Sequence, residues 1–258
     1  MEQSSQIALN IKKFFIEIGE LTYFSSRFFR ELFSKPFEFK ELLRQCYNMG
    51  NKSLGLVLIT GFIIGLVLTI QTRPTLEQFG AESWMPSMVS ISIIREIGPI
   101  ITALICAGRI GSGIGAELGS MRVTEQIDAM EVSGTNPFKY LVVTRVLATT
   151  FMIPILVIFG DAMALYGSFL VENLYGDVSF FLYFDKVFHA IEYSDLLPAT
   201  IKTFFFGYAI GIVGCYKGYY CEKGTVGVGI AANSAVVYTS MLLFIIDFIA
   251  VFVTDIFI

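Results

Sequence analysis

Five long stretches with few charges dominate this chain of 258 residues. They cover about residues 53–72, 86–108, 145–171, 196–216 and 235–254. A helix needs about 20 residues to cross the roughly 30 Å hydrocarbon core of a bilayer, and each stretch reaches that length. Only 16% of the residues are charged, which is too few to cover the surface of a soluble domain. The sequence therefore predicts an all-α membrane protein with five transmembrane helices.

The distribution of Lys and Arg predicts the orientation of these helices. Fourteen of the 18 Lys and Arg residues lie in segments 1–52, 109–145 and 217–223, which fall on one side of the membrane. Three are counted on the other side, in segments 73–82 and 171–202, where Lys202 also begins to enter the fourth span, and Arg95 lies inside the second span. Because loops rich in Lys and Arg stay in the cytoplasm, we predict a cytoplasmic N-terminus and a C-terminus on the outer side.

Residues 1–48 are predicted to form an N-terminal helical region, ahead of a five-span domain at residues 49–258. Apolar residues recur in it at steps of three and four, which is the spacing of one helix face. They are Ile7, Ile11, Phe14, Phe15, Ile18, Leu21, Phe28 and Leu32. A helix with one aromatic-rich face and one charged face lies flat in the membrane interface. We predict that position, and packing on a soluble partner is the alternative.

Motifs for catalysis and ATP hydrolysis are missing. The sequence has no G-x-S-x-G, no H-E-x-x-H and no G-x-x-x-x-G-K-[ST]. Residues 227–232 match a dinucleotide fingerprint in form, but the match lacks the βαβ context that the fingerprint needs. One His and four Cys without a C-x-x-C pair predict no metal site. A net charge of −4 argues against a nucleic-acid partner. We predict no catalytic residue, no metal and no cofactor in this chain.

Four pairs or triplets of Gly recur every four residues within the helical stretches. At helical pitch, such stripes let a second helix approach closely. They are Gly61/Gly65, Gly111/Gly115/Gly119, Gly207/Gly211 and Gly214/Gly218. Helix packing, within one chain or across a dimer, is their predicted role.

A short acidic helix is predicted in the inner segment at about residues 111–140. Thr124 is the expected N-cap, and Gly134 with Pro137 ends the helix. Its acidic residues share one face at three-residue spacing; they are Glu125, Asp128 and Glu131. By pattern alone, a docking surface for a soluble partner and a solvated helix without a partner are equally good interpretations.

Charges inside the spans are candidates for function, because an unpaired charge in the membrane is costly. Arg95, Glu96 and Lys202 lie in the outer halves of the second and fourth spans. Two cations suit a phosphate headgroup, with Arg as a bidentate donor and Lys as a point charge. Leu58 and Phe62 on the first span are predicted to contact the acyl chains. Structural ion pairs or snorkelling to the interface are the alternative.

Three further features belong to the same spans. Gly98 and Pro99 are predicted to kink the second span and open a cavity. Asp161 and Asp247 are each read as a lone acid with a structural role, facing the helix bundle or water rather than lipid.

A run of short motifs extends over the middle and end of the chain. They are Arg95-Glu-Ile-Gly-Pro99, Gly108-Arg-Ile-Gly-Ser112, Ala116-Glu-Leu-Gly119, Thr124-Glu-Gln-Ile-Asp-Ala-Met-Glu131, Gly134-Thr-Asn-Pro137 and Gly218-Tyr-Tyr-Cys-Glu222. This run resembles the signature of the MlaE-type permeases, the membrane subunits of ABC transporters that move phospholipids or related lipids. The resemblance covers about residues 50–258, and the preceding residues match only in character.

The resemblance implies a homodimeric permease in the inner membrane of a bacterium, with its C-terminus in the periplasm. Its role would be phospholipid transport for outer-membrane lipid homeostasis. ATP and Mg would belong to a separate ATP-binding cassette ATPase, coupled through Glu125, Asp128 and Glu131. A periplasmic MCE-domain lipid-binding protein is the expected outer partner, and a small STAS-type cytoplasmic regulator is a further candidate. The resemblance also places Arg95 and its neighbours at the lipid cavity.

Other functions compete with phospholipid transport. An ABC permease for another hydrophobic substrate, such as a sterol or an organic solvent, is the first alternative. An intramembrane lipid enzyme is weakened by the missing catalytic constellation, and a structural scaffold is the last alternative.

Overall fold

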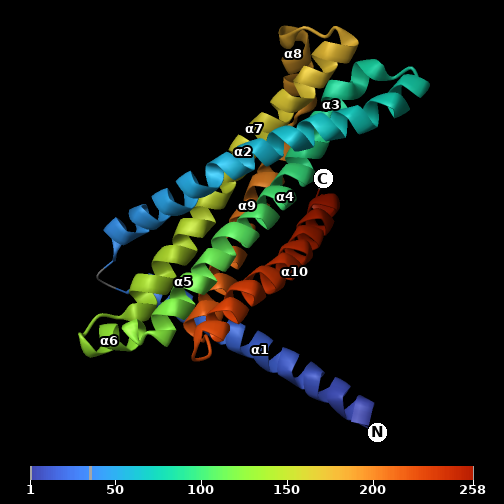
Figure 1. The fold of residues 1–258 in the computed structure, drawn as a ribbon. Coiled ribbons are helices and arrows are strands. Elements are labelled where there is room, and N and C mark those ends of the chain that lie inside the picture. The colour runs from blue at the N-terminus through green and yellow to red at the C-terminus, as the bar shows by residue number, and fades with distance from the viewer. Residues whose placement is uncertain (1, 35–36, 258) are drawn as a thin grey trace.

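The computed structural model describes residues 2–34 and 37–257, and the side chains of residues 15–34 and 37–256. All regular structure within them is helical (Figure 1). The α-helices are α1 (Glu2–Leu32), α2 (Phe39–Gln78), α3 (Met85–Ser92), α4 (Gly98–Cys106), α5 (Ser112–Val123), α6 (Gln126–Val132), α7 (Thr144–Gly176), α8 (Phe180–Ala190), α9 (Tyr193–Tyr219) and α10 (Thr225–Phe257). A 3₁₀ turn, η1 (Glu82–Trp84), and three π turns, η2 (Ile93–Ile97), η3 (Ala107–Gly111) and η4 (Phe138–Val143), join or extend them.

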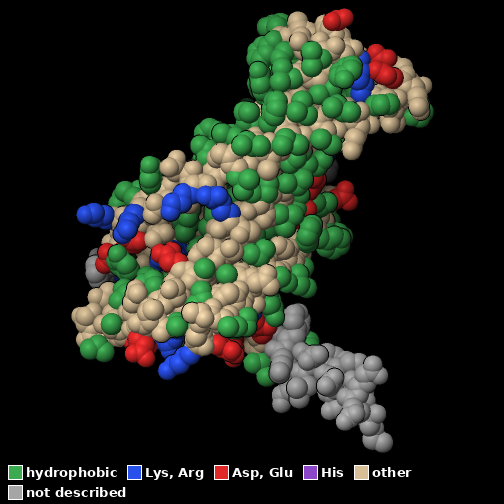
Figure 2. Space-filling model, viewed as in Figure 1, with side chains coloured by type: hydrophobic (Ala, Val, Ile, Leu, Met, Phe, Trp, Pro, Cys, Tyr) green, Lys and Arg blue, Asp and Glu red, His purple; other side chains and the backbone are tan. Residues whose placement is uncertain are grey.

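Within the part of the chain that the structure describes, five helical segments are long and apolar enough to cross a membrane. They are Phe39–Gln78, Glu82–Val123, Phe138–Gly176, Tyr193–Tyr219 and Thr225–Ile256. Each predicted apolar stretch falls inside one of them, which confirms the prediction of five spans. Figure 2 shows that charged side chains gather mainly toward the two ends of the molecule, whereas apolar side chains cover much of its middle.

Glycine positions bring the spans into backbone contact. A Cβ atom at Gly61 or Gly65 on α2 would overlap the carbonyl oxygen of Gly160 or Ala164 on α7. The contact between α9 and α7 is similar, because a Cβ at Gly207 would lie 2.5 Å from the carbonyl oxygen of Thr149. The predicted packing role of these glycine stripes is therefore confirmed within the chain.

The N-terminal region contains two helices rather than one. α1 ends at Leu32 and α2 begins at Phe39, so the predicted boundary at residue 48 falls inside α2. Phe24 and Phe28 of α1 are fully buried, and their rings lie 4.9 Å from Phe138 and 5.6 Å from Tyr208. α1 is thereby attached to the bundle through an aromatic cluster.

Exposed apolar residues on α1 fit a position in the membrane interface, which stays a prediction. Phe15 and Ile18 are exposed, whereas Leu21 and Leu32 are partly buried against the core. The side chains predicted at Ile7, Ile11 and Phe14 lie outside the described residues.

Pro99 interrupts the regular α-helical hydrogen bonding of the second span, which forms a π turn just before it. Pro has no backbone N–H, and its ring collides with the carbonyl four residues earlier, which is that of Arg95. The chain responds with η2, where the N–H of Gly98 bonds to the carbonyl oxygen of Ile93, five residues earlier. Because a π turn inserts one extra residue, it redirects the neighbouring side chains, and Arg95 and Glu96 both lie in it.

The short helix α6 lies at the same end of the bundle as the start of α2, and α8 lies at the opposite end (Figure 1). The predicted N-cap at Thr124 is wrong. Thr124 ends α5, and its hydroxyl donates to the carbonyl oxygen of Ser120 at 2.8 Å. Glu125 takes the cap position instead, in the left-handed region with φ of 57°. This sharp turn, with Gly134 at φ of 81° after the helix, makes α6 a compact loop element.

Tyr183 fixes α8 to the ends of α2 and α7 that lie away from α6. Its hydroxyl donates to Ser168 at 2.7 Å, and the hydroxyl of Thr69 donates to the same Ser168 oxygen at 2.6 Å. Burial raises the pKa of Tyr183 to about 12, so the phenol keeps its proton and its role as donor.

Candidate functional site

Three charged side chains from three different spans meet in one cluster. The ammonium of Lys202 on α9 lies 2.7 Å from a carboxylate oxygen of Glu96 on η2 and 3.0 Å from one of Asp247 on α10. The Lys202 side chain is only 4% exposed. Two carboxylates therefore offset the charge of this buried ammonium. Ion pairs of this kind are the structural alternative that the sequence left open for Glu96 and Lys202.

Arg95 takes a different partner. Its Nε donates to Asp195 at 2.5 Å, and Asp195 is nearly buried. The same carboxylate accepts the backbone N–H of Glu192 at 3.1 Å, and so caps the start of α9. The Arg95 side chain is 52% exposed, which leaves part of its guanidinium open to a ligand.

A cavity of about 180 Å³ lies beside these charges. Arg95 and Lys202 line it together with Glu96, Asp195 and Asp255. The cavity thus presents both signs of charge rather than a purely basic surface.

An apolar groove of about 670 Å³ between α9 and α10 adjoins this cavity. The two share Pro198, Lys202, Ala250 and Thr254 as lining residues. Leu197, Ile201, Phe205, Ile246, Ile249 and Val253 complete the groove. A polar cavity continuous with an apolar groove can hold an amphiphile, with its headgroup at Arg95 and its chains between the two helices.

Gly98 and Pro99 face a second, deeper region. The Asp161 carboxyl occupies the space where a Cβ of Gly98 would lie, and one oxygen of Asp161 is buried without a hydrogen-bond partner among the described residues. Pro99 and Asp161 both line a mostly apolar cavity of about 330 Å³. Asp161 faces the bundle interior, as predicted.

Leu58 and Phe62 do not lie with the charged residues. Both belong to α2, where the ring centroid of Phe62 is 6.3 Å from that of Tyr166 on α7. Neither lines the cavity at Arg95 or the groove between α9 and α10. Their predicted contact with acyl chains stays a prediction.

The acidic residues of the predicted coupling helix are exposed. Glu125, Asp128 and Glu131 all face solvent, and Asp128 accepts a hydrogen bond from Arg122 at 2.5 Å. Val132 at the end of α6 is 91% exposed. Val132 and these carboxylates are thus accessible to a soluble partner, although Asp128 is already paired with Arg122.

Asp195 and Asp247 are the site residues that the sequence interpretation missed. Asp247 is not a lone acid, since it accepts a hydrogen bond from Lys202. The sequence could have indicated this pair, because Lys202 and Asp247 carry opposite charges in two spans and each would be costly alone in the membrane. Asp195 gave no such signal, since it belongs to an acidic outer segment.

Metal ligands do not gather in the part of the chain that the structure describes: no three His, Cys, Asp or Glu side chains there lie close enough to hold an ion.

Comparison with known proteins identifies a family and several relatives. The family described as Permease MlaE matches residues 42–253. A probable ABC transporter permease protein of Rickettsia felis is 38% identical over 237 residues, which is 92% of each chain. The intermembrane phospholipid transport system permease protein MlaE of Haemophilus influenzae is 31% identical over 249 residues, 95% of this chain and 94% of that one. Protein TRIGALACTOSYLDIACYLGLYCEROL 1, chloroplastic, of Arabidopsis thaliana is 33% identical over 210 residues, 81% of this chain and 60% of that one.

Proposed function

The chain belongs to the MlaE permease family, and from this premise we propose that it moves phospholipids between the bacterial inner membrane and a periplasmic MCE-type carrier. As an ABC transporter permease it is a transport subunit without catalytic activity of its own, and it works with an ATPase partner. That the transported substrate is a phospholipid is our proposal. The cavity at Arg95 and Lys202, with its adjoining groove, supports it most directly.

The headgroup of a zwitterionic phospholipid matches the charges of this cavity. Its phosphate would bind the exposed part of the Arg95 guanidinium, which donates in a planar fork suited to phosphate oxygens. An amine on the same headgroup would lie near Asp255, which also lines the cavity. Lys202, held by Glu96 and Asp247, supplies fixed positive charge beside the phosphate. The apolar groove between α9 and α10 would cover the acyl chains.

Binding and release would follow from competition at Arg95. Asp195 and a lipid phosphate both accept hydrogen bonds from the same guanidinium, so strengthening one contact weakens the other. A movement of α9 relative to η2 would change the distance between Asp195 and Arg95. Transport needs two states that differ in their affinity for the lipid, and the contact between Arg95 and Asp195 would differ between them.

The contact with the ATPase would be made by α6. Glu125, Asp128, Glu131 and Val132 form an exposed surface at one end of the bundle, which we place in the cytoplasm from the Lys and Arg distribution. ATP and Mg would bind in the partner chain. A homodimer, the MCE-domain protein and a STAS-type regulator complete the proposed complex.

A sterol or an organic solvent is the second candidate substrate, because the 670 Å³ groove is lined almost entirely by apolar side chains. Such a molecule would use the groove and have little need of Arg95. The two candidates therefore differ in their dependence on the charged cavity.

Transport of labelled phospholipid by the complete complex in proteoliposomes distinguishes them. We expect Arg95→Ala and Lys202→Ala to lower the transport rate about tenfold or more, the loss typical of a charge-assisted contact to phosphate. The matched control is Lys186→Ala, since Lys186 donates to the carbonyl oxygen of Ser83 on the same outer side, away from the cavity. Normal phospholipid transport by both site variants, in complexes that assemble normally, would refute the proposed substrate site.

A further inference from the structure

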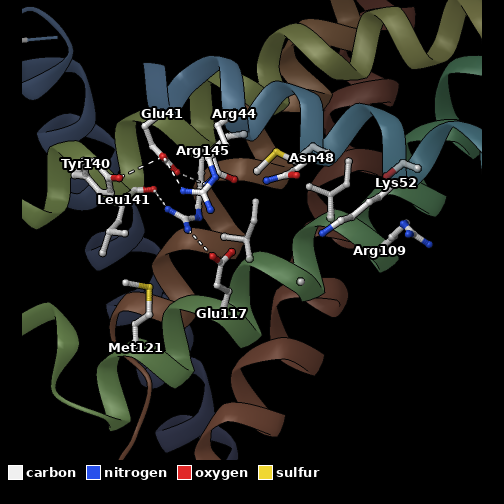
Figure 3. A pocket seen from close by; sticks show the side chains of 16 residues that line it. Glu41, Arg44, Asn48, Lys52, Arg109, Glu117, Met121, Tyr140, Leu141 and Arg145 are labelled. Atoms are coloured by element: carbon white, nitrogen blue, oxygen red, sulfur yellow. Dashed lines mark hydrogen bonds and ion pairs between the residues drawn. The ribbon is translucent and has the colours of Figure 1, made fainter. Parts of the chain in front are cut away.

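A separate cavity of about 460 Å³ lies at the α6 end of the bundle. Its walls are the first half of α2, the segment from η3 into α5, and the turn from η4 into α7 (Figure 3). It shares no lining residue with the cavity at Arg95 or with the groove between α9 and α10. Its chemistry is therefore independent of the proposed transport site.

Positive charge exceeds negative charge in this cavity. Four basic side chains line it, Arg44, Lys52, Arg109 and Arg145, against two carboxylates, Glu41 and Glu117.

The carboxylates serve only one side of the cavity. Arg145 pairs with Glu117 at 2.8 Å and Arg44 with Glu41 at 3.6 Å. Lys52 and Arg109 lie together away from these pairs, as Figure 3 shows. Among the described residues, neither has a hydrogen bond or an ion pair. Two cations are thus left without an acceptor beside a space large enough for one.

Two buried donors in the wall lack acceptors as well. The Nε of Arg145 and the hydroxyl of Ser53 have no hydrogen-bond partner among the described residues, although Arg145 is 2% and Ser53 1% exposed. Buried polar groups are almost always paired, so each exception needs an explanation.

The Ser53 hydroxyl is unusual for its helix. A hydroxyl in a membrane helix commonly bonds the carbonyl one turn earlier, and Thr60 and Thr72 on the same helix do so at 2.7 and 2.8 Å. Ser53 does not. Ser53 and Arg145 both line the cavity, but the two atoms themselves are covered, so an acceptor in the cavity would reach them once the side chains turn toward it.

We propose that this cavity binds a phosphate group. Phosphate is the acceptor that fits, because it offers several oxygens to donors from three elements. Its negative charge would also pair with Lys52 and Arg109, which have no carboxylate partner in the part of the chain that the structure describes. A single carboxylate would leave part of this donor set unpaired. The phosphate belongs either to the headgroup of an anionic lipid or to free inorganic phosphate.

The test is calorimetric titration of the complete complex, delipidated in a maltoside detergent, with two probes. One probe is inorganic phosphate and the other is a short-chain phosphatidylglycerol. The first variant is Lys52→Gln with Arg109→Gln, both exposed residues whose replacement breaks no pair. Lys40→Gln is the matched control, an exposed cation on the same helix that does not line the cavity.

We expect the double variant to lose affinity for at least one probe about tenfold or more, as for lost charge-assisted hydrogen bonds to phosphate. The Lys40→Gln complex should bind like the wild type. Loss with phosphatidylglycerol alone identifies a lipid headgroup, and loss with both probes identifies a site open to free phosphate. Equal binding of both probes by the wild type and the double variant would overturn the proposal, as would a wild type that binds neither.

Ser53→Ala separates a specific site from general attraction by positive charge. It leaves the charge unchanged and breaks no hydrogen bond in the unliganded protein, so its unfolding temperature should not fall. Its affinity for the probe should nevertheless drop severalfold, because the hydroxyl donates only to the bound phosphate. Unchanged affinity in Ser53→Ala would show that the cavity attracts phosphate without the predicted contact, and would overturn the assigned geometry.

Discussion

The buried charge cluster at Lys202 makes a quantitative prediction about stability. Lys202→Met leaves Asp247 and Glu96 without their cation. Breaking a buried ion pair costs about 3–5 kcal/mol, and the lower end applies here because Glu96 is 44% exposed and water screens it. Asp247→Leu leaves Lys202 paired with Glu96, and should cost about 1–2 kcal/mol as one lost charge-assisted hydrogen bond.

The two substitutions should not be additive. In the double variant, neither Lys202 nor Asp247 is stranded, so its destabilisation should be about 2 kcal/mol smaller than the sum of the two single effects. The free energy of unfolding, measured by SDS titration with circular dichroism, gives this coupling directly. A control cycle pairs Lys202→Met with Asp128→Leu, on α6 at the other end of the bundle, and should be additive within about 0.5 kcal/mol.

Additivity of Lys202→Met and Asp247→Leu within that same error would refute the reasoning, because it would mean that the two charges do not interact. A transport assay on the same variants distinguishes a loss of stability from a loss of lipid binding. The double variant should recover stability relative to Lys202→Met but stay defective in phospholipid transport, since the cation beside the headgroup is still missing.

Two further predictions concern orientation and helix packing. A cysteine at Tyr193, which is 90% exposed at the start of α9, should react with a membrane-impermeant maleimide in intact cells, because we predict that this end of α9 lies outside. A cysteine at Val132 should react only after permeabilisation, and the reverse pattern would contradict the predicted orientation. Gly65→Val should destabilise the protein by about 1–3 kcal/mol through overpacking, because its side chain would collide with the Ala164 carbonyl. Gly55→Val is the control in thermal unfolding, since the space around Gly55 is open, and equal melting temperatures would disprove tight packing at Gly65.

Sequence periodicity and hydropathy predicted the spans well, because the physics behind them is local. A run of about 20 apolar residues is a sufficient condition for a membrane helix. The glycine stripes were equally readable, since spacing at helical pitch determines which face a small residue occupies. Helix ends were harder, as Thr124 illustrates: the turn geometry around Glu125, and not the N-cap preference of Thr, decides where α6 begins.

The site was only half predictable, because ion pairing depends on tertiary structure. Arg95, Glu96 and Lys202 stand out in sequence as charges within apolar helices. That Asp247 would join Lys202, and Asp195 would join Arg95, follows from the packing of α9 against α10 and against η2. Leu58 and Phe62 illustrate the same dependence on tertiary structure, since the sequence of an apolar span does not reveal which neighbouring helix each residue faces.

The backbone contact between α2 and α7 has a consequence for how the transporter changes shape. Gly61 and Gly65 let the two helices touch without intervening side chains, so the pair has no deformable layer along which to slide. Close-packed backbones that interlock in this way resist movement relative to each other. When ATP hydrolysis drives a conformational change, α2 and α7 should therefore keep their positions relative to each other. The mobile part would then be α10, whose span is largely uncovered by the rest of the chain.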